Sequence, residues 1–363
     1  MKKCLILAAV ATLTLASCTK TIHKAHTTDR DVPIGFNTAV GVPTKSAITS
    51  ALYPTDGTFK VWALYSSESF ADLDALTTGA ADATKTAVFI PGVAASHTGT
   101  NPNDYWTTST AYYWPKAGYL NFWAVSPSGF AATVSWTAGT ITGPSDYAVT
   151  ATNDVANDVL FSAISANKQE SNYTSGMPYD ETSNDAGSYQ GVDIKFYHAL
   201  SLVDFQVKYG TINGNETLKV TNISLIKPQT VGQLTVTPTG FDSFAAGDGT
   251  VAWSSVLATT DVLVGNSEQT LTDTYASYGS SVLVKPQTFT NGGNALISVT
   301  VTSTIGGVVA TTTHTINLYN ATPDHVWAWG KHYTYKLNVT ERQIIFDPYV
   351  TDWTSVAPDE ITL

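Results

Sequence analysis

The chain has 363 residues, enough for one large or two ordinary domains at about 100–200 residues each. Its net charge of −11 lacks the basic footprint of a nucleic-acid-binding protein, so we expect no nucleic-acid partner. Charged residues make up 13% of the chain, against about 25% in an average soluble protein, and aromatic residues make up 11%. The two cysteines, Cys4 and Cys18, offer neither a disulfide framework nor a thiolate metal site.

Residues 1–18 have the pattern of an export signal. Two lysines are followed by an apolar run over residues 4–15 and by small residues directly before Cys18. The run is shorter than the about 20 residues that a membrane-spanning helix needs. We therefore expect residues 1–17 to be a lipoprotein signal peptide and Cys18 to become a lipid-carrying N-terminus. Cleavage without lipid attachment is the alternative.

Short alternating segments then follow along the chain, separated by loops rich in Gly, Asn, Asp and Thr. They are residues 32–40, 59–65, 119–125, 193–196, 202–207, 218–225 and 295–301. In the first of them, Val32, Ile34, Phe36 and Val40 share one face. Such spacing predicts an all-β chain of antiparallel sandwiches, with one short helix expected within residues 66–76.

The polar stretch 167–191 is the expected domain boundary, with a long surface loop as the alternative. Beyond it, LIKPQT at residues 225–230 is echoed by LVKPQT at residues 283–288. Each copy ends an apolar strand at a proline, which cannot donate to a sheet ladder. We interpret the two copies as equivalent strand ends in one sandwich.

Several motifs resemble the fimbrillin family, the subunits of type V pili. They are YYWPKAGYLNFWAVSP at 112–127, DVLFS at 158–162, VDIKFYHALS at 192–201, VLVKPQ at 282–287, WGKHYTY at 329–335 and IFDP at 345–348. The resemblance implies two transthyretin-like β-sandwich domains in tandem, over residues 46–190 and 191–363, behind a propeptide at 18–45. It further implies an outer-membrane lipoprotein precursor that ends in a cell-surface fimbria. The expected function is structural, supporting adhesion or biofilm formation.

The resemblance also implies assembly by strand exchange. A trypsin-like protease removes the first strand, here the one carrying Val32, Ile34, Phe36 and Val40, and a neighbouring subunit inserts its C-terminal strand into the open groove. A cut after Arg30 would leave that strand attached. A cut between Lys45 and Ser46 removes it together with the lipid, so we expect processing at Lys45, with Arg30 second. Because a lysine stands where the family has an arginine, the identity of the processing protease stays open. A chain that is never cut would be an anchor subunit.

The donor is expected within residues 343–363. Val350, Trp353, Val356, Ile361 and Leu363 are its candidate groove-filling side chains, although Pro358 interrupts the ladder and residues 343–353 could instead be a constitutive strand. A shaft subunit needs a functional donor and a tip subunit does not. The expected partners are therefore other fimbrial subunits, and surface glycans or proteins where the subunit binds a receptor.

The sequence predicts no enzyme and no cofactor. It lacks the common hydrolase and phosphate-loop motifs, and His325 and His332 lack metal-ligand spacing. Asp154 and Asp158 are interpreted as solvated loop acids. The rival class is a monomeric glycan-binding surface lipoprotein, with Trp106 and Trp136 as candidate exposed rings; Trp123 and Trp329 are expected in the core.

Overall fold

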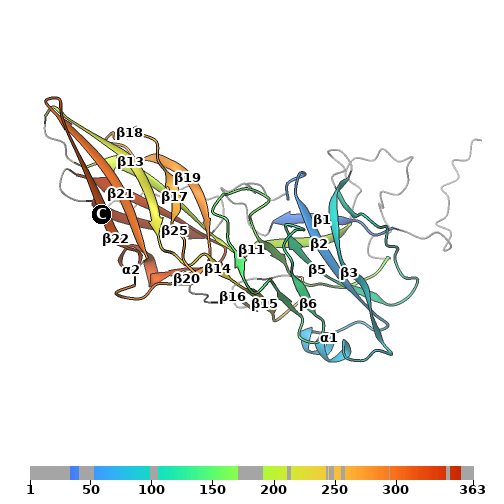
Figure 1. Cartoon of the computed structure of the whole chain (residues 1–363). Coiled ribbons are helices and arrows are strands. Elements are labelled where there is room, and N and C mark those ends of the chain that lie inside the picture. The colour runs from blue at the N-terminus through green and yellow to red at the C-terminus, as the bar shows by residue number, and fades with distance from the viewer. Residues whose placement is uncertain are drawn as a thin grey trace, which may run out of the picture.

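The computed structural model is built almost entirely of β-strands. It describes residues 33–40, 53–98, 105–170, 191–210, 214–242, 244, 249–254, 258–293, 295–340 and 344–352. Figure 1 shows two groups of strands, one around β1, β2 and β5 and the other around β13, β21 and β25. The sequence-based prediction of an all-β sandwich protein is confirmed.

The first group of strands, which we call the first lobe, is one eight-stranded sheet that closes on itself. Its order is β10-β5-β2-β3-β4-β1-β11-β9, and β9 pairs back to β5. The strands are β1 (Phe36–Val40), β2 (Thr58–Ser66), β3 (Thr86–Thr98), β4 (Tyr105–Thr108), β5 (Tyr119–Ser126), β9 (Leu160–Ser162), β10 (Ser165–Lys168) and β11 (Val192–His198). Closure removes the free edges that an open sheet would leave.

The strands β2 and β5 are buried on both faces. On β2, Val61 and Ala63 point into the core enclosed by the closed sheet, whereas Trp62 and Leu64 belong to a second core outside it. That second core also receives Leu73 and Leu76 from α1 (Leu73–Gly79). Two buried faces explain why both strands are nearly continuous apolar runs in the sequence.

The helix α1 lies at the end of the segment where a helix is expected. It covers Leu73–Gly79, so only four of its residues fall within the expected range 66–76. Asp72 is its N-cap, and the Oδ1 atom of Asp72 accepts a hydrogen bond from the backbone N–H of Ala75 at 2.8 Å. This cap fixes the start of the helix.

The chain does not divide into two lobes at residue 191, where the second domain was expected to begin. β11 follows that point and belongs to the first sheet. A small sheet of order β16-β15-β7-β6 then joins β6 (Thr133–Ser135) and β7 (Thr140–Thr142) to the later β15 (Leu234–Pro238) and β16 (Gly249–Trp253). Likewise, β8 (Tyr147–Ala148) pairs with β14 (Val231–Gly232). The second half of the chain therefore returns to cover the first.

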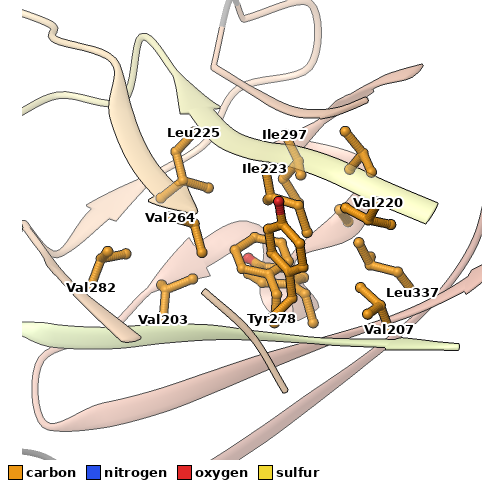
Figure 2. Close-up of a cluster of buried hydrophobic side chains, with 14 of the residues drawn as sticks. Val203, Val207, Val220, Ile223, Leu225, Val264, Tyr278, Val282, Ile297 and Leu337 are labelled. Carbon is orange, nitrogen blue, oxygen red and sulfur yellow. The ribbon is translucent and has the colours of Figure 1, made fainter. Parts of the chain in front are cut away.

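The second group of strands, which we call the second lobe, is a two-sheet sandwich. One sheet has the order β19-β12-β24-β25 and the other β17-β13-β21-β22, with β18 beside β13. The strands are β12 (Ser201–Tyr209), β13 (Glu216–Ile226), β17 (Val262–Gly265), β18 (Gln269–Thr270), β19 (Ala276–Val284), β21 (Leu296–Ile305), β22 (Val308–Asn317), β24 (Lys331–Val339) and β25 (Ile344–Asp352). Figure 2 shows Val203 and Val207 of one sheet facing Val220 and Leu225 of the other.

Short elements close one end of this sandwich. They are β20 (Gln287–Thr288), β23 (Val326–Trp327), α2 (Leu318–Ala321) and the 3-10 turn Pro323–His325. The Tyr335 hydroxyl lies in this region and is fully buried. It accepts a hydrogen bond from Trp327 Nε1 at 2.9 Å and lies 2.7 Å from the Thr322 hydroxyl, and burial raises the pKa of Tyr335.

Two details differ from the expected antiparallel arrangement. The pairings of β1 with β11 and of β12 with β24 are parallel. Alternation along a single strand reports which side chains share a face, but it carries no information about the direction of the neighbour.

The two KPQ copies lie in contact. Gln287 Oε1 accepts a hydrogen bond from the backbone N–H of Gln229 at 2.9 Å, and Gln287 Nε2 donates to the Gln229 carbonyl oxygen at 3.1 Å. Lys285 Nζ, which is buried, donates to Gln229 Oε1 at 3.0 Å, and burial lowers the pKa of Lys285. The echo in the sequence thus becomes a contact that ties β19 to the segment that returns to the first lobe.

Candidate functional site

The strand β1 fills a gap in the closed sheet. It pairs in parallel with β11 over five positions, from Phe36 opposite Val192 to Val40 opposite Phe196. On its other side it pairs with β4 through Phe36 and Trp106. Ahead of the strand, the backbone N–H of Ile34 donates to the Tyr112 carbonyl oxygen at 2.8 Å. Without β1, the facing edges of β4 and β11 would lose these partners.

The side chains of this segment enter the enclosed core in alternation. Ile34 is 3% exposed and Phe36 is fully buried. The Phe36 ring meets Phe59 and Phe122 edge-to-face, at centroid distances of 5.9 and 5.8 Å. Such pairs add to the stabilisation from burial alone.

The structure places two of the four expected β1 side chains in this core. Ile34 and Phe36 lie there as the alternation predicts. The Val40 backbone ends the strand, and Val32 lies outside the described residues. The sequence reasoning missed Thr38, which shares the inner face and is 2% exposed. The Thr38 hydroxyl has no hydrogen-bond partner among the described residues.

Tyr53, the first described residue after β1, is anchored in the same core. Its ring lies 5.1 Å from that of Phe196, and its hydroxyl lies 2.7 Å from the Ser126 hydroxyl. Burial raises the pKa of Tyr53. Residues 41–52 connect this anchor to β1, and the predicted cut between Lys45 and Ser46 falls within that connection, outside the described residues. Arg30 and Cys18 also lie outside them.

At the other end of the chain, β25 is a regular strand of the second lobe. It pairs antiparallel with β24 over nine positions, and Val350 lies opposite Tyr333. Ile344 and Val350 contact the core of the sandwich. Val350, expected as a donor side chain, therefore belongs here to its own sheet, as the constitutive-strand alternative had it. Trp353, Val356, Ile361 and Leu363 lie outside the described residues.

Two histidines each pair with one aspartate instead of joining a larger cluster. Asp158, expected as a solvated loop acid, is instead fully buried, and its Oδ2 atom lies 2.9 Å from Nδ1 of His198. His332 Nε2 lies 2.9 Å from Asp204 Oδ2. Within the described parts of the chain, no three His, Cys, Asp or Glu side chains gather in a way that could hold a metal ion.

Asp154 has a structural role that its sequence position did not reveal. Its Oδ1 atom accepts hydrogen bonds from the backbone N–H and the side-chain amide of Asn157, at 2.9 and 2.7 Å. The Asp154 carboxylate thus fixes the turn that leads to the buried Asp158. Asp154 stabilises a turn, whereas Asp158 pairs with a histidine in the interior.

The tryptophans only partly follow their expected exposure. Trp123 is fully buried, as predicted, and Trp329 is half-buried against the second core. The prediction that Trp106 is an exposed sugar-stacking ring is wrong, because its side chain is 3% exposed and its ring centroid lies 5.7 Å from that of Tyr53. Trp136 is half-buried and meets Trp123 edge-to-face at 5.2 Å.

No helix among the described residues is both long and apolar enough to cross a membrane. No curated protein matches the sequence. A structural similarity exists to a fimbrial protein from Bacteroides vulgatus, with a TM-score of 0.57 and 16% identity over 89% of this chain and 99% of that one. The tip fimbrial protein Mfa3 from Porphyromonas gingivalis, solved with a C-terminal truncation, is similar with a TM-score of 0.38 and 11% identity, over 89% of this chain and 100% of that one. The family model described as fimbrillin-like matches residues 72–353. The chain therefore belongs to the fimbrillin-like family.

Proposed function

We propose that this chain is a pilus subunit that polymerises by strand exchange at the position of β1. The observation that carries the proposal is that β1 is the strand between β4 and β11 in an otherwise continuous closed sheet. It is also the first described strand, so a single cut in residues 41–52 separates it from the rest of the fold. Its removal would leave two unpaired sheet edges and an open apolar slot, the features that bind an extended donor strand.

The energetics favour replacement of β1 over an empty groove. Burial of a side chain such as Ile34 or Phe36 contributes about 1.5–3 kcal/mol each, and the backbone pairing with β11 adds to this. An opened subunit would therefore be held in an unfavourable state until another strand fills the slot. A nine-residue donor would cover about 30 Å.

The donor that we propose lies beyond β25. Nine paired positions hold β25 to β24, so donating that strand would require opening the second lobe. Residues 353–363 follow the last paired position of β25 and carry Trp353, Val356, Ile361 and Leu363. Deletion of residues 354–363 should block chain extension and leave the monomer folded, whereas an unaltered polymer ladder would contradict this donor.

We further propose export as an outer-membrane lipoprotein acylated at Cys18, followed by cleavage after Lys45 by a trypsin-like protease. Cleavage there would release the lipid and β1 together. Arg30 is the second candidate, but it precedes β1 and a cut there would leave the groove filled.

The deciding experiment is intact mass measurement with N-terminal sequencing of protein recovered from the cell surface. A start at Ser46 without lipid, together with an SDS-resistant polymer ladder, is expected for the wild type. Lys45→Gln should abolish both, and the matched variant Arg30→Gln should change neither. A lipid-carrying Cys18 start on the surface form would overturn strand exchange and favour an anchor subunit or a monomeric surface lipoprotein.

A further inference from the structure

The hairpin formed by β21 and β22 ends in an open strand edge. The two strands pair over ten positions without a register shift, from Leu296 opposite Asn317 to Ile305 opposite Val308. Gly306 and Gly307 make the turn with φ values of 56° and 84°, the left-handed region that tight hairpins require. On the side away from β21, no strand of the described residues pairs with β22.

This edge lacks the protection seen at the other edges of the sandwich. The edge strand β25 contains Asp347 and Pro348, a charge and a residue that cannot donate to a ladder. The edge strand β17 has only four residues, and β19 is distorted by a register shift against β12. By contrast, β22 has ten residues, no proline and no Asp, Glu, Lys or Arg.

The end of the hairpin exposes apolar side chains. Val308 is 73% exposed, Val309 is 63% exposed and Ile305 is 44% exposed. Figure 1 shows the turn between β21 and β22 at the end of the molecule farthest from β1. Threonine pairs link β22 to β21 on one face of the hairpin. The hydroxyl oxygens of Thr313 and Thr300 lie 3.1 Å apart, and those of Thr311 and Thr302 lie 3.3 Å apart.

We propose that β22 pairs antiparallel with β22 of a second copy of this chain. With Thr312 opposite its own symmetry mate, Val308 faces Ile316 of the other copy and Val309 faces Thr315. These are contacts between β-branched residues, which stabilise cross-strand pairs. The register keeps inward-facing residues opposite inward-facing ones, so two sheets become one continuous sheet.

Charge favours a second copy as the occupant. Each chain carries a net charge of −11, so two copies repel one another overall. The strand β22 has no carboxylate, so two copies can meet there without opposing acids. One strand pair is a small interface, so the dimer is expected to be weak.

This pairing does not depend on strand exchange, because β1 stays in place. The test is sedimentation velocity of the purified full-length protein over a concentration series up to about 1 mM, with β22 amide hydrogen exchange as a second readout. Self-association with slowed β22 exchange is expected for the wild type. Protein that stays monomeric throughout would overturn the proposal.

Charge variants test the two-fold pairing itself. Thr312→Lys and Thr312→Glu each place like charges directly opposite one another and should weaken self-association about fivefold or more. A mixture of the two variants should restore association to within about twofold of the wild type. The matched control Thr217→Lys adds the same charge at an exposed site on β13 and should associate like the wild type. Equal behaviour of Thr312→Lys and the control, or no recovery in the mixture, would overturn pairing about Thr312.

Discussion

Replacing Phe36 by alanine tests whether β1 is an integral part of the first core. The ring is fully buried and contacts Phe59 and Phe122. Removal of a buried phenylalanine side chain costs about 3–5 kcal/mol of unfolding free energy, because both burial and packing are lost. We expect a loss in this range for Phe36→Ala in the intact chain, measured by urea unfolding with tryptophan fluorescence. Trp106 and Trp114 report on the same core.

Neighbouring positions supply matched controls. Asn37 is exposed, and its side-chain amide donates to Asp193 at the surface, so Asn37→Ala should cost less than about 0.5 kcal/mol. Thr38→Val removes a buried hydroxyl without a described partner and should stabilise the fold by up to about 1 kcal/mol. A Phe36→Ala loss below about 1 kcal/mol, or no larger than that of Asn37→Ala, would refute the role of β1 in the core.

Phe36→Ala should also weaken the retention of β1 after the chain is cut. In a chain cut at an engineered protease site within residues 41–52, β1 is held only by non-covalent contacts. A loss of about 3–5 kcal/mol then corresponds to roughly 10²–10⁴-fold weaker retention of the cut peptide. Size-exclusion chromatography of the cut protein measures this retention directly.

Three further predictions concern buried polar groups. Tyr335→Phe leaves the buried Trp327 N–H without its acceptor and the buried Thr322 hydroxyl without its partner, and should cost about 1–3 kcal/mol in thermal or urea unfolding, whereas Tyr113→Phe, at an exposed site, should be neutral. Burial raises the pKa of Tyr278 to about 12 and also raises that of Tyr335, so above the unfolded value of about 10 the unfolded chain loses these protons first. Stability should therefore fall from pH 10 to 12 by up to about 1.4 kcal/mol per pH unit for each such tyrosine, and a flat profile would contradict this. Asp158→Ala should cost about 3–5 kcal/mol by uncoupling His198, and the double variant with His198→Ala should cost clearly less than the sum of the two single variants.

The sequence alone determined the all-β class of the fold and which side chains of a strand share a face. Alternation of apolar residues marked the strands and placed Ile34 and Phe36 on the core side, because successive side chains of a strand point to opposite faces. The order of the aromatic motifs also indicated the family that the comparison then showed.

Only the tertiary structure decided what covers each face. Trp106 stands among polar neighbours in the sequence, yet closure of the sheet places it against Tyr53. Asp158 lies just before β9 and is buried beside His198 of β11, 40 residues further along the chain. The parallel pairing of β1 with β11 and the return of β15 and β16 to the first lobe likewise join distant segments. Alternation with a period of two residues shows which side chains lie on each face of a strand. It does not show which strands pair, because backbone hydrogen bonds join segments that are far apart in the sequence.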